Sequence, residues 1–269
     1  MAINPVTREA YGARSWRRFS DYRFAATATV IRLAGTEISH AALAMPLAFA
    51  PVDGKPALVA ILGFRQGQNL FVGPDGRWLA RYVPAAFRSW PFRLLKGSDG
   101  RATLGFDEAS GLLAAPREGE AFFEENGEPS EALKQTLDFL ANVSRSQDAA
   151  DAASALLTQH GLLRPWPLKV KDGDQERPVN GLQCVDEAAL GALSGEALLA
   201  LSKGGALALA YAQLLSMANI SILGQLAAAH AGAAQQAQAR AANGNGDLTK
   251  LFKPAEGQGM IDWKKLLDE

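Results

Sequence analysis

The segment LAFAPVDGKPALVAILG (residues 47–63) is the part of the sequence that decides the fold class. Two apolar runs, 47–50 and 58–63, flank the tetrapeptide Val52-Asp53-Gly54-Lys55. Asp-Gly pairs readily adopt the positive φ angles that tight hairpin turns require. We therefore predict a β-hairpin here, as part of an antiparallel sheet.

Similar short apolar runs surround this hairpin, at residues 28–33, 69–72, 79–83, 90–95 and 102–107. Turn sequences separate them, among them Gly73-Pro74-Asp75-Gly76 and Gly97-Ser98-Asp99-Gly100. The β-rich region 24–107 is thus predicted to form one curved antiparallel sheet. Within it, Leu58 to Leu62 and Asn69 to Val72 are expected to pair around the Arg65-Gln66-Gly67-Gln68 turn.

The region 118–230 is predicted to be mainly helical, with a hairpin near 163–185 around Lys171-Asp172-Gly173-Asp174. Side chains suited to capping a helix N-terminus are Ser130, Asp186 and Ser194, and Gly161 is a suitable C-terminal stop. Helical segments are expected at 118–123, from Ser130 to Gln159, and from Ala206 to His230. The fold class is therefore α+β, with the curved N-terminal sheet packed against C-terminal helices.

Residues 1–230 are expected to form a single domain. Residues 231–259, rich in Ala, Gln, Asn and Gly, resemble a flexible linker. Residues 260–269 regain an amphipathic helical pattern, with Trp263 as its largest apolar side chain. We expect this short segment to dock through Trp263. It would bind its own chain, a neighbouring copy of the chain (self-association) or a partner protein.

Composition excludes several classes of function. The 269 residues include 27 Lys plus Arg and 28 Asp plus Glu, so the net charge of −1 disfavours nucleic acid as the partner. The arginines near Trp16 keep a nucleic-acid regulator open as an alternative. The single cysteine, Cys184, and the three scattered histidines predict no disulfide, metal or other cofactor. With no apolar run for a secretory signal near the N-terminus, we expect a cytoplasmic protein.

Residues 204–239 carry no Asp, Glu, Lys or Arg, which raises the question of a membrane span. Polar side chains interrupt the apolar ones at Gln213, Ser216 and Asn219, and no cluster of positive charge flanks the segment. We predict a buried helix of a soluble domain and no membrane span.

A set of short motifs resembles the SapC family. They are LAMPLAF (43–49), LGFRQGQNLFV (62–72), GRW (76–78), YVP (82–84), WPF (90–92), FEENGEP (123–129), GLL (161–163), WPL (166–168), VDE (185–187) and ALAYAQLLSMAN (208–219). The resemblance covers roughly residues 5–225, and its specificity lies in the ordered set rather than in any one motif.

The resemblance implies a bacterial accessory protein, since the family is named for a link to the secretion of a surface-layer protein and offers no catalytic residues to carry over. It also implies neighbours that are halogenase-like, hydroxylase-like or TonB-dependent receptors. The context implied is therefore a surface layer, secretion or peptide modification.

Aromatic residues and arginines form the candidate binding site. Trp78, Tyr82 and Trp90 lie on or beside predicted strands, and Arg65 and Arg77 lie near them in sequence. Such residues either fill the core between sheet and helices or line a groove, and in a groove they are frequent anchors for protein partners. We expect a non-enzymatic protein that binds a polypeptide. A hydrolase or transferase using carboxylates of residues 107–128 is the alternative.

Overall fold

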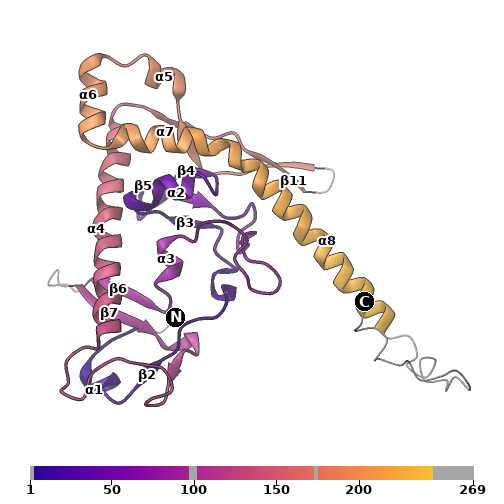
Figure 1. Cartoon of the computed structure of the whole chain (residues 1–269). Helices are drawn as coiled ribbons and strands as arrows, with labels where there is room; N and C mark the ends of the chain where they lie inside the picture. Colours follow the sequence, from indigo (N-terminus) through magenta and orange to yellow (C-terminus); the bar gives the residue numbers. More distant parts are fainter. Residues whose placement is uncertain (1–2, 97–101, 173–174, 245–269) are drawn as a thin grey trace, which may run out of the picture. The chain divides into compact units, whose positions relative to one another are not determined.

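The computed structural model of the chain describes residues 3–96, 102–172 and 175–244. Its strands form four antiparallel sheets, and its longer helices follow residue 130 (Figure 1). This is the α+β class predicted from the sequence. The chain divides into two units, Met1–Ala227 and Ala228–Glu269. All four sheets belong to the first unit.

The largest sheet has five strands in the order β10-β13-β4-β5-β3. Their bounds are β3 Val30–Arg32, β4 Leu47–Val52, β5 Lys55–Ile61, β10 Leu163–Pro165 and β13 Gln183–Val185. The predicted hairpin is confirmed, because β4 pairs with β5 from Leu47↔Ala60 to Val52↔Lys55. Its two turn residues have positive φ, 50° at Asp53 and 75° at Gly54.

The predicted hairpin near 163–185 is also confirmed, as the β10–β13 pair and its extension, β11 (Lys169–Asp172) with β12 (Gln175–Pro178). It extends the N-terminal sheet through the partner pair Gln183↔Phe49 between β13 and β4. The large sheet therefore combines strands from both halves of the chain, which the sequence did not predict.

The prediction of one sheet over residues 24–107 is wrong. A second sheet has the order β1-β7-β6 and a third the order β8-β2-β9, with bounds β1 Ile3–Pro5, β2 Ser15–Trp16, β6 Phe92–Lys96, β7 Ala102–Asp107, β8 Leu113–Ala114 and β9 Glu120–Ala121. The division reflects two hydrophobic cores, one around the five-stranded sheet and one formed by Tyr11, Trp16, Phe92, Leu104, Phe106, Phe122, Leu133 and Leu140. The helix expected at 118–123 is replaced by β9, whose residues pair with Ser15 and Trp16.

Residues 69–72 do not form a strand beside β5, whose neighbours are β4 and β3. A backbone bond from Leu70 N to Leu62 O at 2.8 Å links the two runs. Leu70, Phe71 and Val72 are buried in succession, so their side chains fill the first core instead of alternating between two faces of a sheet. The run 79–83 is irregular and leads into α3 (Ala85–Arg88).

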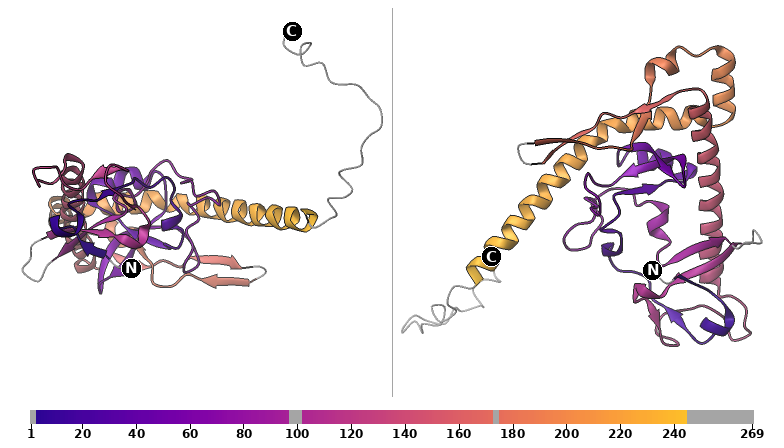
Figure 2. Two further views of the ribbon diagram at one scale, coloured as in Figure 1. Left: turned by 90° about the horizontal axis from the view of Figure 1, so that it is seen from below. Right: turned by 180° about the vertical axis from the view of Figure 1, so that it is seen from behind.

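Helix α4 (Glu131–Gln159) joins the two cores. It runs past the five-stranded sheet and the β1-β7-β6 sheet in Figures 1 and 2. The predicted cap is confirmed, since the Ser130 side chain accepts a hydrogen bond from Leu133 N at 3.2 Å. The chain leaves the helix at Gly161, whose φ is +66°. Leu133 and Leu140 near the N-terminus of α4 lie in the second core, and Ala153 and Leu157 near its C-terminus lie in the first.

The remaining helices of the first unit are short. Asp186 and Ser194 cap α5 and α6, as predicted. The bounds are α1 Arg8–Tyr11, α2 Ile38–Ala42, α5 Glu187–Gly191, α6 Gly195–Lys203 and α7 Ala206–Ser216, with 3-10 turns η1 Arg23–Ala25, η2 Gly35–Glu37, η3 Glu108–Ser110 and η4 Met217–Asn219.

The helix expected from Ala206 to His230 is divided by η4 into α7 and α8 (Ile220–Gly244). Residues 231–244, expected to belong to a flexible linker, continue α8; a sequence rich in Ala and Gln has high helix propensity even when it has few large apolar groups. Residues 245–259 of that linker and the segment 260–269 lie outside the described residues.

By length and composition, the helical stretch Ala206–Ala239 is apolar enough to cross a membrane, with a mean hydropathy of 1.6 over its most apolar window. One such helix is weak evidence for a span, because core helices of soluble proteins pass the same test. A third of that window, 33%, is buried inside the protein. Ala206, Leu209 and Ala210 lie in the first core.

Candidate functional site

Trp90 stands between the two hydrophobic cores, directly after α3 and before β6. Its indole is half-buried and stacks on the ring of Phe24, with centroids 4.8 Å apart and an interplanar angle of 6°. The Trp90–Pro91 peptide bond is cis. Trp90 lines three cavities of about 420, 480 and 500 Å³, which we together call the Trp90 cleft.

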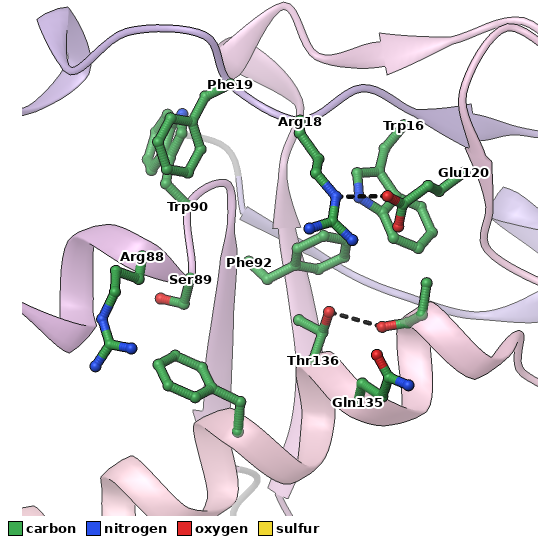
Figure 3. A pocket seen from close by; sticks show the side chains of 12 residues that line it. Trp16, Arg18, Phe19, Arg88, Ser89, Trp90, Phe92, Glu120, Gln135 and Thr136 are labelled. Carbon is green, nitrogen blue, oxygen red and sulfur yellow. Dashed lines mark hydrogen bonds and ion pairs between the residues drawn. The ribbon is translucent and has the colours of Figure 1, made fainter. Parts of the chain in front are cut away.

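The first cavity of the cleft is shown in Figure 3. Its aromatic walls come from three parts of the chain: Phe19 from the N-terminal segment, Phe92 from β6 and Phe139 from α4. Trp16 also lines this cavity, and its ring meets that of Phe92 edge to face, with centroids 5.1 Å apart. The packing of α4 against both cores therefore brings together rings that are far apart in sequence.

Arginines border the aromatic walls. Arg18 forms an ion pair with Glu120 at 2.5 Å, so its charge is already balanced within the cavity wall. Arg88 and Arg93 are exposed, and neither has a carboxylate partner among the described residues. The Arg88 guanidinium lies 5.1 Å from the Phe139 ring centroid, a cation–π contact that keeps its charge next to the cleft. Two positive charges thus flank Trp90: Arg88 lines the first cavity and Arg93 lines the second.

Trp78, a predicted site residue, belongs to the core. Its indole N–H donates to Tyr82 O at 2.7 Å, and its ring packs on Phe71 and Phe87, each with centroids 5.6 Å away. Both the polar and the apolar parts of the side chain are therefore engaged inside the protein. Trp90 stacks on Phe24 and Trp78 packs on Phe87, and these two phenylalanine rings are neighbours at 6.2 Å. Trp78 itself lines none of the three cavities.

Tyr82 lies above a buried carboxylate. Its hydroxyl donates to Glu37 Oε2 at 2.9 Å, and Glu37 also accepts from Ala34 N and Ala85 N, each at 2.7 Å. Burial and then the negative charge of Glu37 raise the pKa of Tyr82 to about 12. Glu37, only 4% exposed, therefore joins η2 to the start of α3, the helix that carries Arg88.

A separate cavity of about 430 Å³ lies over this carboxylate and includes His40, Tyr82 and Arg88 in its wall. The His40 ring stacks on Tyr82, with centroids 5.6 Å apart. Arg88 Nη2 donates to the Tyr82 hydroxyl at 3.3 Å. Arg88 therefore lies on the boundary between this cavity and the Trp90 cleft.

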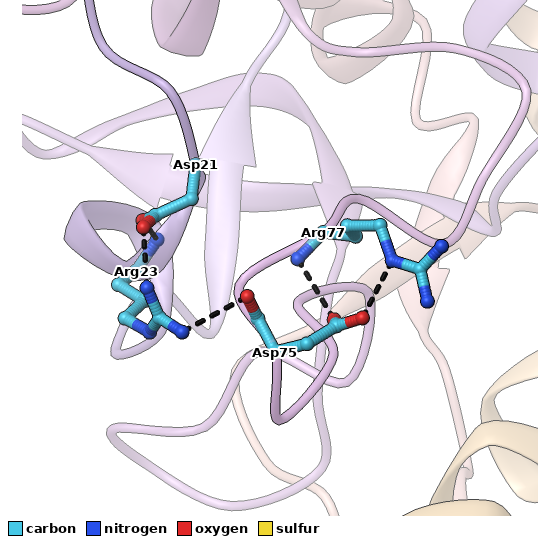
Figure 4. A network of polar contacts seen from close by, with 4 residues as sticks. All are labelled: Asp21, Arg23, Asp75 and Arg77. Carbon is cyan, nitrogen blue, oxygen red and sulfur yellow. Dashed lines mark hydrogen bonds and ion pairs between the residues drawn. The ribbon is translucent and has the colours of Figure 1, made fainter.

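The predicted arginines lie elsewhere. Arg77 forms an ion pair with Asp75 at 2.5 Å within the Gly73–Arg77 turn, and Arg23 donates to the Asp75 carbonyl at 2.9 Å (Figure 4). Arg65 lies on an exposed turn whose carbonyl accepts from Thr29 Oγ1 at 3.1 Å. The structure thus does not bring Arg65 or Arg77 to the cleft beside Trp90. Trp263 lies outside the described residues.

Sequence reasoning missed the aromatic partners of Trp90, namely Phe19, Phe24 and Phe139. No spacing along the chain links these residues, because they meet only through the packing of α4 and the N-terminal segment against β6. The Trp-Pro pair at 90–91 identifies the central residue of the cleft without its surroundings.

Of the carboxylates considered for hydrolysis or transfer, Glu118 and Glu120 form surface ion pairs, whereas Asp107 is buried and lines the third cavity of the cleft. Arg17 pairs with Glu118 at 2.6 Å, beside the Arg18–Glu120 pair. These ion pairs engage Arg17 and Arg18, two of the arginines near Trp16 that were considered for binding nucleic acid. Cys184 is buried, and burial raises the pKa of its thiol. Within the described ranges, no group of three or more His, Cys, Asp and Glu side chains is placed to hold a metal ion.

Comparison with known proteins gives one match. Neither the curated proteins nor the solved structures contain a match to the chain. A family model described as SapC matches residues 6–223, which is most of the chain and includes Trp90 and every wall of the cleft. The chain therefore belongs to the SapC family.

Proposed function

We propose that this protein is a non-enzymatic binding protein that recognises a polypeptide through the Trp90 cleft. One observation carries the proposal: a half-buried tryptophan is shared by three adjoining cavities and is flanked by Arg88 and Arg93. Trp and Arg are the residue types most often found as energetic anchors of protein interfaces.

The cleft favours a ligand with apolar and acidic groups. Its aromatic walls supply area for apolar side chains, while Arg88 and Arg93 attract carboxylates. The positive charges are exposed, so they act mainly on association rate and partner choice, and salt weakens them. A polypeptide segment with alternating apolar and acidic side chains meets both requirements.

Peptides selected from a random twelve-residue display library against the full-length protein provide the test. Binding of each selected peptide is measured by fluorescence anisotropy. Trp90→Ala should weaken binding at least tenfold, because it removes the shared wall of all three cavities. Tyr211→Ala, which truncates an aromatic residue that is 54% exposed on α7, should leave it unchanged.

Folding of each variant is checked by thermal unfolding. Because Trp90 also stacks on Phe24, Arg88→Gln serves as a second variant that removes charge without removing a core ring. It should weaken binding at low salt and flatten the salt dependence. Folded variants that all retain the wild-type affinity would show that the cleft is not the binding site.

The biological context we propose is a bacterial surface layer, secretion or peptide modification, with halogenase-like or hydroxylase-like proteins among the neighbours. Membership of the SapC family supports this context. Crosslinking in cells between the full-length protein and its partners tests it, with Trp90→Ala as the negative control. Partners that are lost in the variant and belong to none of these processes would contradict the proposed context.

A further inference from the structure

The second cavity of the Trp90 cleft, of about 480 Å³, lies along the edges of two sheets. Arg93 and Leu94 of β6 both line it, as do Ile31 and Arg32 of β3. Successive side chains of a strand point to opposite faces, so a cavity that touches two neighbours in each strand runs along the edge. β6 and β3 are both edge strands, of the three-stranded and the five-stranded sheet.

The outward groups of β6 follow from its register. Asp107 N donates to Pro91 O at 3.1 Å, and the register continues with Arg93↔Gly105 and Leu94↔Leu104. Hydrogen-bonded and non-hydrogen-bonded residue pairs alternate in an antiparallel ladder. Since Pro91 and Asp107 form a bonded pair, the backbone N–H and C=O of Arg93 also bond to β7. The N–H and C=O of Leu94 therefore point away from β7, towards the open edge.

The open edge of β3 is shorter. Leu62 N donates to Thr29 O at 2.8 Å and Leu33 N donates to Leu58 O at 3.0 Å, so Val30 and Arg32 direct their backbone groups outward. Strand β3 has three residues and β6 has five. Arg32 Nε, in the wall of the same cavity, is buried and has no hydrogen-bond partner. Its Nη2 forms an ion pair with Asp151 at 2.5 Å, so the charge of Arg32 is balanced within the protein. What the cavity offers a ligand is the two strand edges and Arg93.

We infer that the ligand binds as an added β-strand on the open edge of β6, an extended polypeptide segment carrying acidic side chains. This inference rests on the proposed function and specifies how the cleft would hold its ligand. Main-chain hydrogen bonds to Leu94 fix the segment, since backbone pairing accepts any sequence. Arg93 on β6 selects for carboxylates, and Trp90 receives an apolar side chain.

Proline substitution tests the backbone contact directly. Leu94→Pro removes an N–H that the β6–β7 ladder does not use, and proline is tolerated on edge strands in that position. Leu94→Ala is the matched control, because it truncates the same side chain and retains the N–H. Val30→Pro removes the corresponding donor from the competing edge, β3.

The probe is a peptide selected on the full-length protein as described above. Leu94→Pro should bind the peptide at least tenfold more weakly than Leu94→Ala, which allows for the loss of the side chain from the cavity wall, and Val30→Pro should change wild-type binding less than threefold. In the wild-type protein, hydrogen exchange at the Leu94 amide should slow at least tenfold on peptide binding. Peptides enriched in Asp and Glu are expected from the selection.

The outcomes separate this inference from the proposed function. If Trp90→Ala abolishes binding while Leu94→Pro does not, and Leu94 exchange is unchanged, strand addition on β6 is wrong and the cleft remains a peptide site. Loss of binding with Val30→Pro alone would overturn the assignment to β6. If neither Trp90→Ala nor Leu94→Pro weakens binding, both proposals fail. Unfolding curves of every variant identify any that lose binding through loss of structure.

Discussion

The side chain of Gln213 in α7 takes the place of a strand-to-strand hydrogen bond next to Val185. Gln213 Oε1 accepts from Val185 N at 2.9 Å, and its Nε2 donates to Leu47 O at 3.2 Å. The partner pair Gln183↔Phe49 places Val185 opposite Leu47 in the same register. The amide of Gln213 thus completes the ladder where β13 and β4 separate, and attaches α7 to both.

Two neighbouring polar side chains continue this attachment. Ser216 Oγ accepts from Leu47 N at 3.0 Å, and Asn219 Nδ2 donates to Ala42 O at 2.7 Å. The polar residues that interrupt the apolar segment therefore face the protein and satisfy the backbone groups of β4 and of the end of α2. This arrangement is what a core helix requires, because buried polar groups are costly without partners.

Gln213→Leu should destabilise the protein by about 2–6 kcal/mol, because it leaves Val185 N–H and Leu47 C=O buried without partners, at about 1–3 kcal/mol each. Urea unfolding measures the loss. Gln225→Leu, the same change at an exposed position of α8, should fall within about 0.5 kcal/mol of wild type. Equal stability of the two variants would show that the Gln213 bridge contributes nothing.

The raised pKa of Tyr82 predicts that the protein loses stability at alkaline pH. Burial and the charge of Glu37 raise the pKa of its hydroxyl from 10.0 to about 12 in the folded protein. Above pH 10 the unfolded chain loses this proton first, so the contribution of Tyr82 is complete below pH 10 and disappears as the pH approaches 12. Urea midpoints between pH 9 and 12 should therefore fall less steeply in Tyr82→Phe than in wild type. The exposed Tyr211→Phe should retain the wild-type slope.

Gly63 occupies a position with no space for a side chain. A Cβ there would lie 2.2 Å from the carbonyl oxygen of Gln68, a backbone atom that cannot rotate away. Gly63→Ala should therefore destabilise the protein by about 1–3 kcal/mol, the usual cost of overpacking. Gly224→Ala, in α8 with open space around its Cβ position, should be neutral or stabilising by up to about 1 kcal/mol. Thermal unfolding of the two variants gives the comparison, and a Gly63→Ala protein as stable as wild type would contradict the steric argument.

The C-terminal segment supplies a prediction from sequence. Ile261, Trp263, Leu266 and Leu267 would align on one side of a helix, so Trp263→Ala should weaken self-association or partner binding by about 1 kcal/mol or more. Sedimentation velocity of the full-length chain measures self-association. Lys264→Ala, its neighbour in sequence, is the control. A change of several kcal/mol in unfolding free energy for Trp263→Ala would instead make the segment part of the core.

The sequence by itself determined the local structure. Asp53-Gly54 formed its tight turn because those residues accept positive φ, and Ser130, Asp186 and Ser194 capped their helices because a side-chain oxygen next to the first turn finds free N–H groups. These features depend on residues a few positions apart. The α+β class followed from them, since apolar runs of strand type precede residue 107 and helical patterns follow residue 130.

Only the tertiary structure decided how the strands and aromatic residues are grouped. Residues 69–72 have the composition of a strand but are buried on all sides, so they became core filling, whereas β13 crossed from the C-terminal half to join β4. Trp78 and Trp90 are both half-buried aromatic residues of the predicted site, yet Trp78 packs against the first core and Trp90 lines the cleft. The difference arises because a side chain's surroundings depend on which distant elements pack over it, here α4 and residues 19–24, and no pattern of neighbours in the sequence records that packing.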